Sequence, residues 1–66
     1  MNVRLNGQQH LVDDGATLSD LVSLLKLDRD WIAVEFNQDV IPRARWGEVS
    51  LKEGDKIEVV QLVGGG

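Results

Sequence analysis

The residues of this chain best suited to chemistry are its last three, Gly64, Gly65 and Gly66. Glycine has no Cβ, so these residues can adopt almost any backbone conformation and present no side chain that could pack. At full extension three residues reach about 10 Å. A thin segment ending in a carboxylate is suited to entering a narrow site on another protein, where the carboxyl group of Gly66 would be the reacting group. The alternative interpretation is a frayed, low-complexity end.

Side chains that could catalyse a reaction or bind a metal are scarce elsewhere. His10 is the one histidine, and cysteine and tyrosine are absent. A hydrolytic triad needs a histidine beside a nucleophile and an orienting acid, whereas Ser19 and Ser23 fall in a predicted helix away from such groups. Asp13-Asp14 and Glu53-Gly54-Asp55 have turn composition and do not match a calcium loop. The sequence therefore predicts no catalytic residue, no metal site and no cofactor bound by this chain, which is not expected to be an enzyme.

Composition restricts the partners and the compartment. The formal net charge is −4 at pH 7, which disfavours nucleic acid and anionic membrane surfaces and would steer the chain towards a basic protein partner. No stretch approaches the length of a transmembrane helix, and the first residues lack the apolar run of a signal peptide. Together with the absence of cysteine, these features favour a reducing, cytoplasmic location.

The N-terminal residues predict two paired strands. Met1, Val3 and Leu5 alternate with polar residues, a period of two that is typical of a half-buried strand. Asn6-Gly7 is a strong signal for a two-residue hairpin turn, because both residue types tolerate a positive φ. A second strand is expected over residues 8–12.

A helix should follow the hairpin. Thr17 and Asp20 have the spacing of a capping box, with Asp in the place of the usual Glu or Gln. The helix is expected to end near Leu27, and so short a helix must be held by packing on a sheet. Its apolar positions form one stripe at helical spacing, which comprises Leu18, Leu21, Val22, Leu24 and Leu25.

The second half predicts more strands and one helical turn. Residues 31–36 alternate as a strand, and Val40-Ile41 form a short extended piece that Pro42 terminates or confines to an edge. Residues 42–46 are consistent with a single helical turn that has Pro42 at its first position. Trp46 is expected to pin this turn to the core.

The last strand, residues 56–63, should present two different faces. If Ile57 and Val59 face the helix, then Val60 and Leu62 lie on the bare side of the sheet. Exposed apolar residues next to a functional end suggest a surface on which a partner docks. The alternative is that these residues are apolar because strands favour such residues.

The element order predicts an α+β domain over residues 1–63, followed by a flexible tail at residues 64–66. One helix would cover one face of a mixed sheet of four to five strands. Placing the first and last strands side by side and parallel at the centre would bury the most apolar surface, and the middle of the chain supplies the long crossover that parallel pairing needs. This arrangement is a β-grasp, the fold of ubiquitin.

Several segments together resemble the sulfur carriers of thiamine biosynthesis, the ThiS type. The resemblance covers the whole chain, and the combination of Asn37, Pro42-Arg43, Trp46 and a terminal Gly-Gly in so short a chain is its most specific part. The matching segments are Val3 to Gly7, the helix from Leu18 to Leu25, Phe36-Asn37, Val40 to Arg43, Trp46, Leu51 to Glu58 and Val63 to Gly66.

The resemblance implies a function for the tail. An E1-like adenylating enzyme of the ThiF type would activate the carboxylate of Gly66 with ATP, and the adenylate would become a thiocarboxylate. A thiazole synthase of the ThiG type would accept the sulfur. Gly65 corresponds to the second glycine of the required pair, and Gly64 extends the tail. In this interpretation the chain is a substrate, and ATP is bound by its partner.

Two other functions fit parts of the sequence. The small subunit of molybdopterin synthase also ends in Gly-Gly, although it resembles this chain less around Pro42 and Trp46. A ubiquitin-like interaction module with an inert tail is the second alternative.

Overall fold

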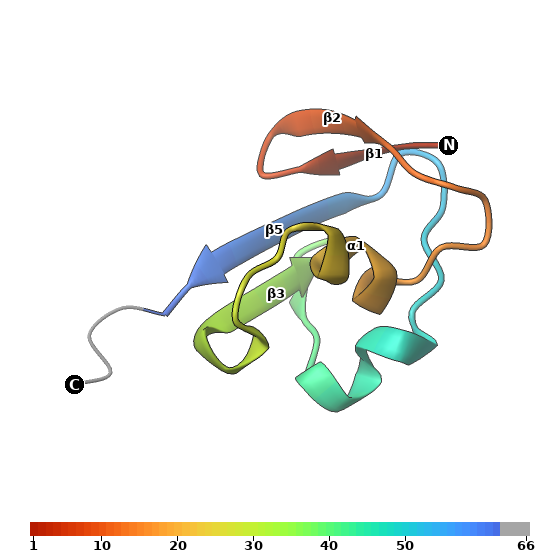
Figure 1. Ribbon diagram of the computed structural model, residues 1–66. Coiled ribbons are helices and arrows are strands. Elements are labelled where there is room, and N and C mark those ends of the chain that lie inside the picture. Colours follow the sequence, from red (N-terminus) through yellow and green to blue (C-terminus); the bar gives the residue numbers. More distant parts are fainter. Residues whose placement is uncertain (63–66) are drawn as a thin grey trace.

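The computed structural model describes residues 1–62, which form one five-stranded sheet in the order β2-β1-β5-β3-β4 (Figure 1). The helical elements are α1 and two 3₁₀ helices, η1 and η2. In chain order the elements are β1 (Asn2–Leu5), β2 (Gln8–Leu11), α1 (Leu18–Leu24), η1 (Arg29–Trp31), β3 (Ile32–Phe36), β4 (Asp39–Val40), η2 (Arg43–Glu48) and β5 (Lys56–Gln61).

The N-terminal hairpin forms as the sequence predicts. Leu5 pairs with Gln8 across the two-residue turn Asn6-Gly7, whose φ values are 51° and 81°. Both central residues are therefore left-handed, and a turn of this kind matches the twist of the flanking strands. The second strand ends at Leu11, one residue before the predicted limit.

Helix α1 begins as predicted but is shorter. The side chain of Thr17 accepts from the backbone N–H of Asp20, and the side chain of Asp20 accepts from the N–H of Thr17, so the capping box is complete. The prediction of an end near Leu27 is wrong, because Lys26 adopts a left-handed φ of 56° that breaks the helical repeat. Leu24 is also misassigned to the buried stripe, since 71% of it is exposed.

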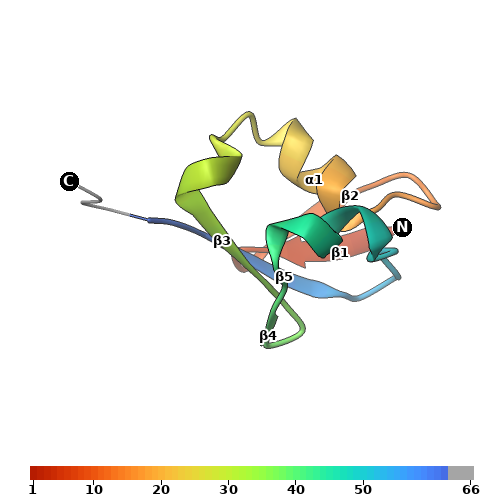
Figure 2. The same ribbon diagram turned by 90° about the horizontal axis from the view of Figure 1, so that it is seen from below.

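The first and last strands lie side by side at the centre of the sheet. β5 pairs parallel with β1 and antiparallel with β3, which confirms the predicted β-grasp. The crossover from β1 to β5 carries α1, η1 and η2, and these elements lie on one face of the sheet (Figure 2).

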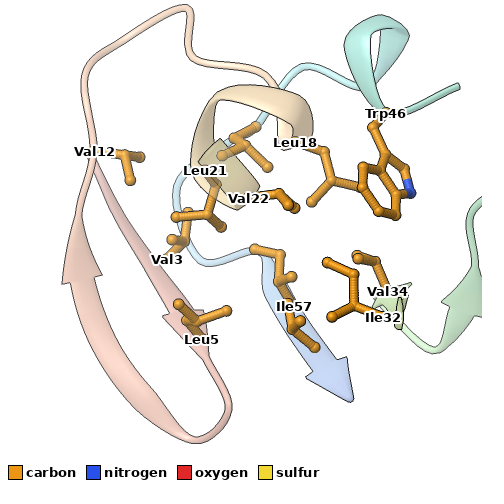
Figure 3. Close-up of a cluster of buried hydrophobic side chains, with 12 residues drawn as sticks. Val3, Leu5, Val12, Leu18, Leu21, Val22, Ile32, Val34, Trp46 and Ile57 are labelled. Atoms are coloured by element: carbon orange, nitrogen blue, oxygen red, sulfur yellow. The ribbon is translucent and has the colours of Figure 1, made fainter. Parts of the chain in front are cut away.

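The core fills the space between α1 and the sheet (Figure 3). Trp46 closes one side of it at 2% exposure, and its indole Nε1 donates to the carbonyl of Ile41 at 2.8 Å. The predicted core role of Trp46 is confirmed. The buried apolar residues are Val3, Leu5, Val12, Leu18, Leu21, Val22, Ile32, Val34, Trp46, Leu51, Ile57 and Val59.

Two boundaries differ from the predictions in the second half. Trp31 belongs to η1, so β3 begins at Ile32. The helical turn expected over residues 42–46 is a 3₁₀ helix that begins after Pro42, whose ψ of 143° is extended. The predicted boundary of the domain at Val63, and the predicted tail, lie outside the described residues.

Candidate functional site

β5 leads to the predicted reactive segment, and both of its neighbours hold it in place. β1 pairs with β5 only through Lys56 and Ile57. Beyond that point the side chain of Asn6 continues the pairing, because its Oδ1 accepts from the N–H of Val59 at 2.8 Å and its Nδ2 donates to the carbonyl of Val59 at 3.3 Å. One side chain thus satisfies both backbone groups that a longer β1 would have bound.

On its other side β5 is paired almost to the last described residue. The ladder with β3 runs to the pair Ile32 and Gln61. The N–H of Leu62 then donates to the carbonyl of Trp31 at 2.6 Å. The described chain is therefore anchored up to Leu62, one residue beyond the end of β5.

The beginning of β5 is held by a second asparagine. Asn37 has a φ of 50°; its Nδ2 donates to Oδ1 of Asp55 at 3.1 Å, and its Oδ1 accepts from the N–H of Lys56 at 2.9 Å. Asp55 also accepts from the N–H of Lys52 at 2.7 Å. These contacts fix the turn that delivers the chain into the central strand.

The two faces of β5 differ as the sequence predicts. Ile57 and Val59 are buried against the helical layer, whereas 52% of Val60 and 51% of Leu62 are exposed. Val60 alternates with the buried Val59 along β5, so it lies on the face of the sheet opposite to α1, η1 and η2, which Figure 2 shows on one side. Leu62 continues this alternation one residue beyond the end of the strand. An apolar strip therefore leads along the open face to the end of the described chain.

Val40 belongs to the same open face and was not singled out from the sequence. It pairs with Glu35, which pairs in turn with Glu58 two residues before Val60. Cross-strand partners point to the same side of a sheet, so Val40 and Val60 share a face. The sequence does place an apolar residue in a short edge strand. Which face of the sheet the side chain of Val40 occupies depends on the register of β4 against β3, which local sequence does not specify.

The other residues considered for chemistry are not brought together. His10 lies in β2 opposite Val3, while Ser19 and Ser23 are on α1, where the hydroxyl of Ser23 donates to the carbonyl of Ser19 at 2.9 Å. Within residues 1–62, no group of three or more His, Cys, Asp or Glu residues could hold a metal ion. None of the helices described there combines the length and hydropathy needed to cross a bilayer.

Gly64, Gly65 and Gly66 lie outside the described residues, so their roles stay predictions. What the structure adds is the platform before them, which consists of an anchored central strand and an exposed apolar strip.

Comparison with known proteins assigns the chain to a family. The ThiS family model matches residues 3–66. The sulfur carrier protein ThiS of Bacillus subtilis (strain 168) is 37% identical over 65 residues, which cover 97% of this chain and 98% of that protein. The crystal structure of a thiamine biosynthesis protein (ThiS) from Geobacter metallireducens superimposes with a TM-score of 0.83 at 32% identity, with 100% of both chains covered.

A second kind of relative is much longer. The thiazole synthase of Magnetococcus marinus is 42% identical over 66 residues, and this chain spans 20% of its length. The thiazole synthase of Paramagnetospirillum magneticum is 32% identical over the same number of residues, again 20% of its length. The match to the family model, the full-length relative and the shared fold agree, and the chain belongs to the ThiS family.

Proposed function

We propose that this chain is a sulfur carrier of thiamine biosynthesis, and that the carboxylate of Gly66 is the group that carries the sulfur. The observation that supports this most directly is the family match, which extends to residue 66. The pairing of β5 and the backbone hydrogen bond of Leu62 just beyond it support it further, because a fixed platform lets a partner locate a short segment without ordering the whole chain.

The chemistry requires activation of a poor electrophile. The carboxylate attacks the α-phosphate of ATP, pyrophosphate leaves, and an acyl-adenylate forms. A sulfide-equivalent nucleophile then attacks the acyl carbon, AMP leaves with the C–O bond electrons, and a thiocarboxylate remains. Splitting one difficult substitution into two easier ones is the usual logic of covalent activation. The E1-like partner supplies ATP, positioning and charge stabilisation, and this chain supplies only the acyl group.

The absence of side chains near the carboxyl group suits this role. A Cβ at position 65 or 66 would widen the segment that must enter the partner's pocket, whereas glycine leaves only backbone. Gly64 extends the reach of the segment. Val60 and Leu62 are the proposed docking residues, because they present exposed apolar surface immediately before that segment.

Thiazole synthase is the proposed acceptor of the sulfur. Two thiazole synthases contain a stretch similar to this entire chain, which supports a functional association between the two kinds of sequence. When the sulfur of the thiocarboxylate is transferred, water or hydroxide takes its place at the acyl carbon. This substitution regenerates the carboxylate of the carrier.

The test is an incubation with the adenylating enzyme, ATP and a sulfur donor, followed by intact-mass analysis. We expect a gain equal to the exchange of one oxygen for one sulfur, located in the C-terminal peptide. Deletion of Gly66 and the variant Gly65→Val should abolish the gain. Gly47→Ala is the matched control, because Gly47 has no left-handed φ and nothing lies within 4 Å of an added Cβ.

Two results would overturn the proposal. An unchanged mass, with an enzyme that modifies another ThiS-family protein in the same assay, would favour the inert interaction module. Binding of the large subunit of molybdopterin synthase in a pull-down, with no binding of thiazole synthase, would favour the molybdopterin pathway. The variant His10→Ala should keep full carrier activity. A variant without carrier activity would instead indicate a catalytic role for His10.

A further inference from the structure

A groove of about 470 Å³ lies between α1 and the loop that leads from β2 into it. This loop, drawn in orange, is at the end of the molecule opposite to the end of β5 (Figures 1 and 2). The groove is therefore separate from the strip of Val60 and Leu62, and nothing in the proposed carrier chemistry uses it.

Two exposed leucines border the groove. Leu11, at the end of β2, is 79% exposed, and Leu24, in the last turn of α1, is 71% exposed. They are the two most exposed large apolar residues among those described. Removing apolar surface from water is favourable, so a partner that covers the two leucines lowers the free energy of the complex.

The polar part of the groove is acidic. Asp13, Asp14 and Asp20 line it, and no lysine or arginine does. Asp20 uses one oxygen in the capping box. Asp14 lies 3.6 Å from the ammonium of Met1 but is 95% exposed, so this pair contributes little. Asp13 makes no side-chain hydrogen bond or ion pair with any residue in the described range. The guanidinium of Arg29 donates to the hydroxyl of Ser23, which also lines the groove. The three aspartates still leave the groove with an excess of negative charge beside its apolar edges.

We infer that this groove, named here the acidic groove (Leu11, Asp13, Asp14, Asp20 and Leu24), binds a cationic segment of a partner protein. One large apolar side chain of that segment lies between the two leucines, and flanking lysine or arginine side chains face the aspartates. Charge complementarity selects this occupant over nucleic acid and anionic membranes, which the same aspartates repel.

A second copy of the chain does not fit the acidic groove. The net charge of each chain is −4, and α1, its one regular α-helix in the described range, has no basic residue in its last turn. The exposed arginines of η2, Arg43 and Arg45, are already paired with Asp30 and Glu48. A different, basic protein is therefore the better occupant.

The position of the groove has a functional consequence. A partner bound there leaves the end of β5 and the open face of the sheet accessible (Figure 1). The chain could then be held by one protein while another acts on its C-terminal segment. The inference does not depend on the chemistry proposed for Gly66.

The test uses the ¹⁵N-labelled chain and two synthetic amphipathic peptides of equal length, one of leucine and lysine and one of leucine and glutamate. We expect saturable one-to-one binding of the lysine peptide, with amide shift changes centred on residues 11–16 and 20–24. The glutamate peptide should not bind. The variants Leu24→Ser and Asp13→Asn should each raise the Kd of the lysine peptide, about tenfold for Leu24→Ser.

Val40→Ser is the matched control, because Val40 is an exposed apolar residue on the open face and its loss should leave the Kd unchanged. Circular dichroism checks that each variant is folded. Shift changes that map to the open face, equal affinity for both peptides, or no saturation by the lysine peptide would each overturn the inference.

Discussion

Asn6 serves as an extension of strand β1 towards Val59. Its amide oxygen accepts the N–H of Val59 at 2.8 Å and its amide nitrogen donates to the carbonyl of the same residue at 3.3 Å. The residue also occupies the left-handed region, with a φ of 51°, as the hairpin turn requires. One side chain therefore joins the turn of the first hairpin to the central strand.

The variant Asn6→Gly separates these two roles, because glycine keeps the turn geometry and removes the amide. We expect the free energy of unfolding to fall by about 1–3 kcal/mol, since a partly buried N–H and carbonyl lose their partners. Urea denaturation measures the change. Gln38→Gly, at a φ of 77°, is the control and should be neutral or stabilising by up to about 1 kcal/mol. Equal stabilities for Asn6→Gly and the parent would show that the amide contacts contribute nothing.

Lys26 ends helix α1 in a conformation that suits glycine better. Its φ of 56° places a Cβ where the left-handed region is crowded. The variant Lys26→Gly should therefore raise the free energy of unfolding by about 0.5–1 kcal/mol. Lys52→Gly, at an exposed lysine whose φ is not left-handed, should lower it slightly. A loss of stability in Lys26→Gly as large as that in Lys52→Gly would contradict the assigned helix end.

The two tryptophans should respond differently to the same change. Trp46→Phe removes the bond to the carbonyl of Ile41 and leaves a small void, so we expect a loss of about 1–3 kcal/mol. Trp31→Phe, at a half-exposed position, should cost no more than about 0.5 kcal/mol. Thermal denaturation compares the two. The fluorescence of Trp31→Phe, which retains only the buried indole, should also be shifted towards shorter wavelength.

The two faces of β5 allow a matched test of docking. Val60→Glu should lower the rate of thiocarboxylate formation at least about tenfold while changing the free energy of unfolding by no more than about 1 kcal/mol. Val59→Glu should unfold the chain, because Val59 is buried in the core. Circular dichroism and intact mass give the two readouts. An unfolded Val60→Glu variant would place that side chain in the core, and a normal rate would remove it from the docking surface.

Most of the fold could be predicted because its signals are local. Asn6-Gly7 specifies a hairpin turn by φ alone, the capping box of Thr17 and Asp20 starts the helix, and the alternation around Ile57 fixes which face of β5 is buried. Each of these three signals uses residues within one turn or one strand of each other. The central parallel pair is predicted differently, because the first and last strands have the strongest apolar patterns and bury the most surface when placed side by side.

What could not be predicted depends on contacts between distant residues. The bonds of Asn6 to Val59 span 53 positions, and no local pattern marks which asparagine will make them. Leu24 illustrates the opposite error, in which a local pattern predicts a contact that does not form. It belongs to a leucine-rich segment and is expected to be buried, but it is exposed. At 3.6 residues per turn it lies about 110° from the centre of the stripe formed by Leu18, Leu21, Val22 and Leu25, and so it faces solvent.

The candidate site was foreseen in part. Val60 and Leu62 are exposed as expected, while the roles of Gly64, Gly65 and Gly66 are still predictions. The acidic groove was not foreseen, because Asp13 and Asp14 have ordinary turn composition and acquire a neighbour in Leu24 only once α1 has folded back beside their loop.

The central position of β5 also affects when the protein can fold. Ribosomes make this strand after every other element described here, yet β1 and β3 both pair with it. A nascent chain that stops before Lys56 has two separate strand pairs and no continuous sheet, so its apolar residues stay exposed to proteases and chaperones. The sheet therefore cannot be completed before β5 has been synthesised. Any chain that reaches the native state already contains the strand that leads to its proposed sulfur-carrying end.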